Sequence, residues 1–384
     1  MSKKGIIGIV ILALIGFGVW YYLNGRVEVA DEKEIVKIGV IMPQTGPVAE
    51  PGKNAMQGIQ LAIENYNIDA TTKIQLVIED SKSNPKDGVS AMNKLVNTDN
   101  TKIIIGDIMS SVFLATAPIA EKNKIVLFSP GASAPAVREA GDYIFRNYLS
   151  DDFDGKVMAS YIFNEKGIKN VAVLTVNNDY GIGVEKTFLN EYKKLGGSVS
   201  FNEQYMQGET NFKTILTKLK SQSFEALYLI CNPTENGHIV KQMKELNIKT
   251  QLFGNLSFES EAFIKLAKGS FDKVTFSAPY FNLEEDKELN KKFNVDYEAK
   301  YKVKPDVAAA LGFDVALILI KALKKSNYDV SKVKDILYTI KDFDGVTGKT
   351  TFDDKGDVLK DIYIKEISGD GGISIVKLFS YNLL

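Results

Sequence analysis

Short apolar runs alternate with segments of helical periodicity from residue 35 to residue 253, and this alternation constrains the fold more than any other feature. In the first part of this region the predicted strands are residues 36–42, 73–79, 102–106 and 124–128. Between the first two strands, Ala55, Ile59 and Ala62 recur at helical intervals. Continuous apolar strands that alternate with amphipathic helices predict an α/β fold, in which helices cover both faces of a parallel sheet.

A second series of apolar runs follows, with predicted strands at residues 171–176, 198–205, 225–230 and 250–253. Two such series in 384 residues indicate two lobes of the same general architecture. The stretch from Pro305 to Leu323 is apolar on nearly all sides, so it is predicted to be a buried helix. After it, short strands are expected at residues 349–352, 361–367 and 373–379.

Composition excludes several classes of function. The formal net charge is −1, so no overall field attracts nucleic acid, and we expect no nucleic-acid partner. The single cysteine, Cys231, follows an apolar run and is predicted to be a buried thiol. The only histidine, His238, is expected at the surface. Because a cysteine zinc site, a nucleophile elbow and a phosphate loop are all missing, the sequence predicts no metal, no cofactor and no enzyme.

The N-terminus carries an apolar segment, Ile6 to Leu23, of 18 consecutive residues without a charge. A helix of this length spans about 27 Å, close to the thickness of a bilayer core. Two lysines precede the segment and an aromatic cluster ends it, as in a transmembrane helix with its N-terminus inside. We therefore predict a cytoplasmic tip, an uncleaved anchor and a polar spacer within residues 1–34, with the remaining chain extracytoplasmic. A cleaved signal peptide is the main alternative, and a cytosolic chain is a weaker one.

Small and polar residues follow two neighbouring strands of the first series. Ser110 and Ser111 come after residues 102–106, and the sequence SPGASAP, with Gly131 and Ser133, comes after residues 124–128. One interpretation is ordinary helix capping by the serines. The other is a carboxylate site, because hydroxyls, glycine backbone and two helix N-termini would meet at one sheet edge. The sequence alone leaves both interpretations open.

The sequence NNDYGIG follows the strand predicted at residues 171–176. It lacks the third glycine and the downstream acid of a dinucleotide-binding loop, so that function is not predicted. Tyr180, which lies within it, could close over a ligand held by the other lobe, or it could be a surface turn residue.

Several segments occur in an order typical of one family: KIGVIMPQTGPVAEPGKNAMQGIQLAIENYN, IIIGDIMSS, VLFSPGASAP, NNDYGIG, GETNFKTILTKLK and LGFDVALILIKAL. Over residues 35–384 the chain resembles the branched-chain amino-acid (leucine-binding) family of type I solute-binding proteins, which serve ABC importers. The resemblance implies the type I periplasmic binding protein fold, with two Rossmann-like lobes that have parallel sheets and are joined by a three-strand hinge.

The resemblance also implies a domain organisation, with chain crossings near residues 148, 280 and 361. Lobe one would comprise residues 35–148 and 280–360, and lobe two residues 149–279 and 361–384. Such a monomeric clamp closes around one small ligand and delivers it to permease subunits in the membrane. A tethered ligand sensor that is not coupled to transport is the alternative function.

The family's carboxylate contacts fall on Ser110 and Ser133, through their hydroxyls, and on Gly131, through its backbone. The family aromatic that covers the ligand falls on Tyr180. Three other family positions carry different residues here. An acid that holds the ligand's ammonium falls on Leu256, and two aromatics fall on Asn232 and Pro51.

Losing that acid would leave a buried ammonium unpaired, which is costly. Either another acid compensates, with Glu209, Asp179 and Asp314 as candidates, or the ligand carries no ammonium. We therefore predict a membrane-tethered binding protein for an amino acid or a similar small carboxylate.

Overall fold

A computed structural model describes residues 35–380, and the predicted N-terminal anchor lies outside this range. The first series of strands forms a five-stranded parallel sheet in the order β2-β1-β3-β4-β5. Its members are β1 (Ile35–Met42), β2 (Lys73–Asp80), β3 (Ile103–Ile105), β4 (Val126–Ser129) and β5 (Ile144–Arg146). The four predicted strands are confirmed as β1 to β4. The fifth strand, β5, was not expected.

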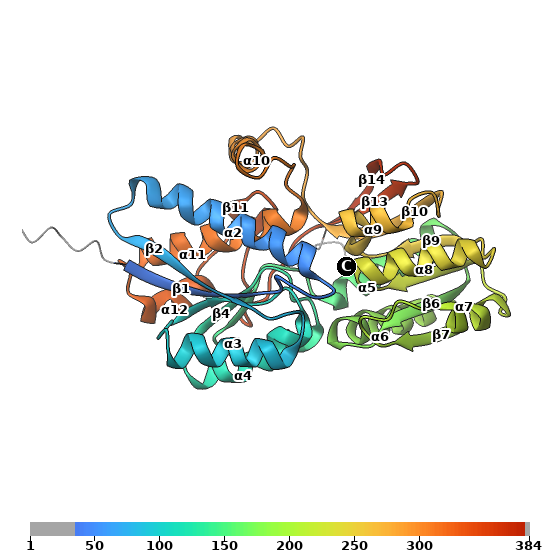
Figure 1. Cartoon of the computed structure of the whole chain (residues 1–384), viewed down its shortest axis with the longest axis horizontal. Helices are drawn as coiled ribbons and strands as arrows, with labels where there is room; N and C mark the ends of the chain where they lie inside the picture. The colour runs from blue at the N-terminus through green and yellow to red at the C-terminus, as the bar shows by residue number, and fades with distance from the viewer. Residues whose placement is uncertain (1–34, 381–384) are drawn as a thin grey trace, which may run out of the picture.

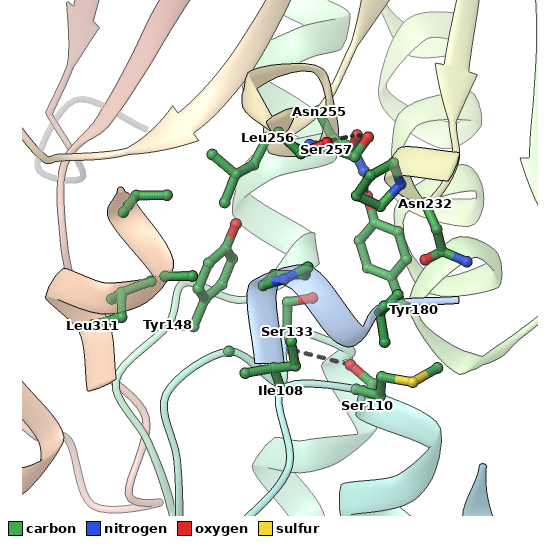
Figure 2. Close-up of a pocket in the computed structure, with 18 of the residues that line it drawn as sticks. Ile108, Ser110, Ser133, Tyr148, Tyr180, Asn232, Asn255, Leu256, Ser257 and Leu311 are labelled. Atoms are coloured by element: carbon green, nitrogen blue, oxygen red, sulfur yellow. Dashed lines mark hydrogen bonds between the residues drawn. The ribbon is translucent and has the colours of Figure 1, made fainter. Parts of the chain in front are cut away.

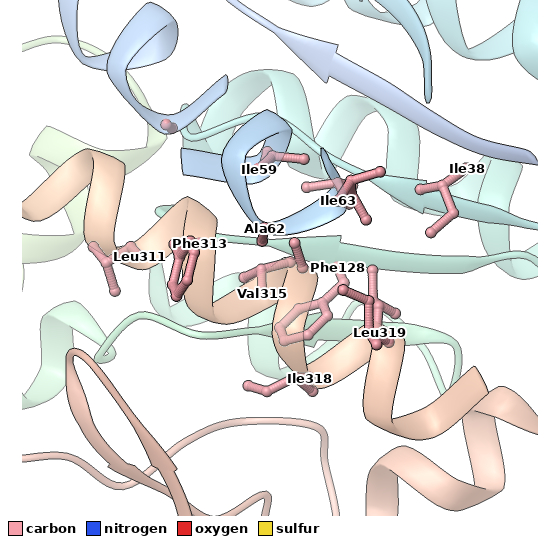
Figure 3. Close-up of a cluster of buried hydrophobic side chains, with 14 of the residues drawn as sticks. Ile38, Ile59, Ala62, Ile63, Phe128, Leu311, Phe313, Val315, Ile318 and Leu319 are labelled. Carbon is pink, nitrogen blue, oxygen red and sulfur yellow. The ribbon is translucent and has the colours of Figure 1, made fainter. Parts of the chain in front are cut away.

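Helices cover both faces of this first sheet, as the alternating pattern predicts. On one face α2 (Ala49–Asp69) and α11 (Val307–Lys325) pack against the apolar side chains of β1 and β4. Figure 3 shows side chains of α2, such as Ile63, and of α11, such as Val315 and Leu319, in one cluster with Phe128 of β4. On the other face lie α3 (Pro85–Asn97) and α4 (Ser110–Lys122).

The helix predicted at residues 305–323 is confirmed as α11, and its side chains are buried on nearly all sides. It approaches α2 closely at two glycines. A Cβ atom on Gly312 would lie 2.2 Å from the carbonyl oxygen of Ala55, and one on Gly58 would lie 1.9 Å from that of Ala309. Both helices therefore need glycine where their backbones meet.

The second series of strands forms a seven-stranded sheet in the order β14-β13-β10-β9-β8-β6-β7. The strands from β7 to β10 along this order are parallel, and β13 and β14 add to the β10 edge as antiparallel strands. The members are β6 (Asn170–Val176), β7 (Ser198–Tyr205), β8 (Ala226–Ile230), β9 (Gln251–Gly254), β10 (Lys273–Pro279), β13 (Ile362–Ser368) and β14 (Ile373–Phe379).

Two groups of helices cover the second sheet. The apolar residues of α5 (Asp151–Ser160) and α6 (Asp179–Lys194) pack on one face. Those of α7 (Lys213–Lys220), α8 (Pro233–Glu245) and α9 (Glu261–Ala267) pack on the other. The remaining elements are η1 (Pro135–Glu139), η2 (Tyr161–Glu165), η3 (Leu256–Glu259), α10 (Glu288–Tyr301), η4 (Val330–Lys332), α12 (Val333–Tyr338), β11 (Phe343–Gly345) and β12 (Gly348–Thr350).

The two sheets lie side by side, and the chain passes between them three times (Figure 1). It leaves the first sheet after β5, returns after β10 to add α10 and α11, and enters the second sheet again at β13. Between residues 35 and 380, no helix combines the length and the apolar character needed to cross a bilayer.

Candidate functional site

A cavity of about 180 Å³ lies between the two sheets, where strand ends and helix starts from both sides meet (Figure 2). All seven residues predicted as ligand contacts line it: Pro51, Ser110, Gly131, Ser133, Tyr180, Asn232 and Leu256. They come from α2, α4 and the loop after β4 on one side, and from α6, the N-cap of α8 and η3 on the other. The topology therefore brings together residues that are more than 200 positions apart, as ligand sites in open α/β sheets require.

Ser110 links the two polar turns to each other instead of capping a helix, so the capping interpretation is wrong for this residue. It is the first residue of α4, whose N-cap is Met109 and has no side-chain hydrogen bond. Its Oγ accepts hydrogen bonds from the backbone N–H groups of Ser133 and Ala134, both at 3.0 Å. Since a hydroxyl has one proton to donate, that proton remains available for a ligand.

Ser129 satisfies two backbone N–H groups within the SPGASAP loop. The Oγ of Ser129 accepts from the N–H of Gly131 at 3.0 Å and from that of Ala132 at 2.7 Å. The backbone N–H of Gly131, which was predicted to contact a carboxylate, is therefore already used within the loop. A side chain at Gly131 would collide with Ile108, because its Cβ would lie 2.9 Å from the Cβ of Ile108. The requirement for glycine here comes from packing.

Ser133 also does not cap the short helix that follows it. The N-cap of η1 is Ala134, without a side-chain hydrogen bond, although Pro135 occupies the first turn as expected. The Ser133 hydroxyl is consequently free of a capping role and lies at the cavity wall (Figure 2). Two hydroxyls, from Ser110 and Ser133, thus face the same space.

A buried arginine fixes the position of this loop. Nη1 of Arg146 donates to the carbonyl oxygens of Ser133, at 2.8 Å, and Ala134, at 3.0 Å. The other guanidinium nitrogens form a two-point contact with the carboxylate of Asp357, at 2.6 and 2.7 Å. The Arg146 side chain is 0% exposed. Sequence analysis missed this residue, because nothing in the pattern of β5 distinguishes it from a surface arginine.

The opposite wall contains the predicted aromatic residue and an apolar patch. Tyr180 lies in the first turn of α6, which Asn178 caps by accepting from the N–H of Gly181 at 2.9 Å. The Tyr180 hydroxyl is hydrogen-bonded to the side-chain amide of Asn255. Leu256 begins η3 on this wall, and Tyr148 and Leu311, the latter from α11 on the side of the first sheet, complete the apolar lining in Figure 2.

None of the three acids that were predicted to compensate for Leu256 lines the cavity. Asp314 is buried elsewhere and accepts from the backbone N–H groups of Val346 and Thr347, both at 2.8 Å. Glu209 accepts from its neighbours' backbone within its own loop, and Asp179 is exposed at the start of α6. These candidates are therefore wrong, and four other acids line the cavity: Asp151, Asp154, Glu259 and Asp306.

Four carboxyl groups at or near the cavity have a raised pKa, and burial is the largest cause for Asp306 as it is for the other three. Burial raises the pKa of Asp154 to about 6 and that of Asp107, beside Ile108, to about 7. Burial, with the neighbouring charge of Asp154, raises the pKa of Asp151 well above its ordinary value. Each group resists ionisation because its charged form is removed from water.

These groups make the unliganded protein less stable as the pH rises. Their pKa values in the folded state lie above the value of 3.8 expected in the unfolded chain. The native state therefore holds more protons, and its stability falls between about pH 4 and pH 7. Since one pKa unit corresponds to about 1.4 kcal/mol, the shifts of Asp154 and Asp107 together predict a free energy of unfolding about 4 kcal/mol lower at pH 8 than at pH 5. Urea denaturation at the two pH values tests this, and a higher stability at pH 8 would contradict it.

With this geometry in place, comparison with known proteins identifies the family. The family model described as periplasmic binding protein matches residues 35–372. The chain belongs to this family. Members of the family are solute-binding proteins and not enzymes, which confirms the prediction that the chain has no catalytic function.

Sequence relatives place the chain near the branched-chain amino-acid-binding members. The Leu/Ile/Val-binding protein homolog 1 of Brucella suis is 29% identical over 367 residues, which cover 93% of this chain and 94% of that protein. The Leu/Ile/Val-binding protein of Escherichia coli is 27% identical over 331 residues, which cover 85% and 88%. The predicted family resemblance is confirmed.

Solved structures agree with the type I fold. The leucine-binding protein LivK of Thermotoga maritima superposes with a TM-score of 0.86 at 26% identity, covering 91% of this chain and 100% of that one. LivJ of Streptococcus pneumoniae, in complex with isoleucine, gives 0.83 at 29% identity, covering 90% and 100%. A solute-binding protein of R. palustris in complex with benzoate gives 0.83 at 20% identity, covering 90% and 96%, and shares the fold.

Proposed function

We propose that this protein captures an amino acid or a similar small carboxylate between two lobes and delivers it to the permease of an ABC importer. The observation that carries this proposal is the pair of hydroxyls of Ser110 and Ser133 at the wall of one cavity. Hydroxyl groups that donate to a carboxylate make charge-assisted hydrogen bonds, which are among the stronger ones in proteins. Relatives that bind leucine, isoleucine or valine support the amino-acid class.

In this proposal residues 35–148 and 280–360 form lobe one, and residues 149–279 and 361–384 form lobe two. The three chain crossings act as the hinge between the lobes.

Hydrogen bonds link the two lobes next to the cavity. The carboxylate of Glu50 in α2 accepts from the backbone N–H groups of Glu261 and Ala262 at the start of α9, both at 2.8 Å. Such contacts favour the closed form, because they exist only when the lobes meet.

Replacing Glu50 with alanine should weaken ligand binding about three- to tenfold. The variant loses a carboxylate at a helix N-terminus, and the lost contacts lower the population of the closed form. Isothermal titration calorimetry measures the change. Glu64→Ala is the matched control, since Glu64 lies on the same helix but pairs with Lys300 of the same lobe. Equal affinities for Glu50→Ala and the wild type would show that this contact does not contribute to closure.

We further propose that the protein acts outside the cytoplasm and that residues 6–23 tether it to the membrane. The family supports the extracytoplasmic location. Membrane fractionation of the expressed full chain tests the tether, because an uncleaved anchor keeps the protein in the detergent-soluble membrane fraction.

A thermal-shift screen of amino acids and carboxylic acids tests the binding function. A tight ligand raises the melting temperature by mass action, because it binds only the folded state. We expect at least one compound with a free carboxylate to do so. Stabilisation only by compounds that lack a carboxylate would overturn the proposed site.

A further inference from the structure

We propose that Asp151 and Asp154 form a seat for an ammonium group of the ligand, in place of an acid at Leu256. This inference rests on the proposed function and specifies the ligand as a zwitterion. Both carboxylates belong to the first turn of α5 and line the cavity. With a spacing of three residues, they lie on the same side of that helix.

Each of these side chains has an unsatisfied oxygen. Oδ2 of Asp151 and Oδ1 of Asp154 are buried without a hydrogen-bond partner among the described residues. Asp151 is 1% exposed and Asp154 is 9% exposed, so water around the protein does not solvate them freely. Buried carboxylates without partners are costly, and native proteins retain them mainly where a function requires them.

The other two acids at the cavity are already paired. Both carboxylate oxygens of Glu259 accept from Nζ of Lys365, at 3.0 and 2.8 Å. Asp306 accepts from the backbone N–H of Ala309 and from the side-chain amide of Asn54, both at 2.8 Å. The hydroxyls of Ser133 and Ser277 approach the carboxyl groups of Asp151 and Asp154, but one buried oxygen of each group still lacks a donor among the described residues.

No lysine, arginine or histidine of the described residues lines the cavity to provide that donor. Arg146, which lowers the pKa of Asp151 against the effect of burial, already forms its two-point contact with Asp357. A cation carried by the ligand would supply the missing charge. The rings of Tyr148 and Tyr180, which also line the cavity, would favour it further, because aromatic faces attract ammonium groups.

The seat lies next to the proposed carboxylate site. The backbone N–H of Asp151 donates to the carbonyl oxygen of Ser133 at 2.9 Å, so the serine and the aspartate are direct neighbours. An α-amino acid carries its ammonium and carboxylate on the same carbon and can contact both. Its side chain would then face the apolar lining that includes Leu256 and Leu311. Leu256 thus contributes apolar surface, and the charge that the family pattern places there comes from α5.

The test compares pairs of compounds that differ only in the ammonium group, using calorimetry on the full chain. The pairs are L-leucine with 4-methylpentanoate and L-phenylalanine with 3-phenylpropanoate. We expect at least one amino acid to bind at least 100-fold more tightly than its partner acid. Equal binding within every pair would overturn the seat while leaving the carboxylate site intact. Failure of all four compounds to bind would overturn the proposed function and the seat together.

Asp154→Asn should weaken amino-acid binding at least tenfold and reduce the preference over the partner acid. The same variant should raise the melting temperature of the unliganded protein, because it removes an unpartnered buried charge. Asp152→Asn is the matched control: Asp152 lies between the two acids, is exposed, and accepts from Oγ1 of Thr187 at 3.0 Å. It should leave affinity within about twofold. A lower melting temperature and unchanged affinity in Asp154→Asn would assign this residue a structural role and contradict the proposal.

Discussion

Replacing Ser133 with alanine should weaken ligand binding by about 10- to 100-fold and leave the stability of the unliganded protein nearly unchanged. A hydrogen bond to a charged group contributes about 1.5–3 kcal/mol, which corresponds to this range. Stability should be nearly preserved because the contacts that hold the loop in place use the backbone of Ser133, and its hydroxyl contacts the chain only at the carboxyl group of Asp151. The N–H of Ser133 donates to Ser110, its carbonyl oxygen accepts from Arg146, and its side chain does not cap η1.

Calorimetry with the amino acid that gives the largest thermal shift measures this effect. Ser133→Thr is the conservative control, since it keeps a hydroxyl at the same position and should retain most of the affinity. Undiminished binding by Ser133→Ala would show that this hydroxyl does not contribute to ligand binding.

Replacing Arg146 with methionine should lower the free energy of unfolding by about 3–5 kcal/mol, the largest effect on stability that we expect. The variant leaves the carboxylate of Asp357 buried without its main partner, and it removes one of the two donors to each of the carbonyl oxygens of Ser133 and Ala134. Urea denaturation gives the free energy, and a loss below about 1 kcal/mol would contradict this account of the buried pair.

A double variant separates the two roles of Arg146. Arg146→Met with Asp357→Leu removes both charges, so much of the stability should return. Ligand affinity should remain reduced, because the loop carbonyls still lack the guanidinium that positions Ser133. Recovery of both stability and affinity would show that the arginine does not position the loop.

The sequence predicted most strands of the two sheets, although β5 and β10 were not expected, and it predicted part of the cavity lining. The strand segments at residues 38–42 and 171–174 are continuously apolar because helices cover them on both faces. The carboxyl ends of parallel strands meet at one edge, so the turns with Ser133 and Tyr180 could be placed near a ligand before their contacts were known.

Contacts between distant segments could not be predicted in the same way. Ser110 is a good capping residue by its position, but its Oγ bonds to the next loop, which only the tertiary structure shows. Asp151 and Asp154 resemble ordinary acids that stabilise a helix N-terminus. Nothing local in the sequence reveals that they are buried at a cavity, whereas Asp314 is buried but does not line it.

A crystal structure of the protein with the amino acid that stabilises it most would test the central claim most directly. We expect the ligand to occupy the cavity between the two sheets, with its carboxylate within hydrogen-bond distance of the hydroxyls of Ser110 and Ser133. A ligand bound elsewhere, or one whose carboxylate contacts neither hydroxyl, would contradict it.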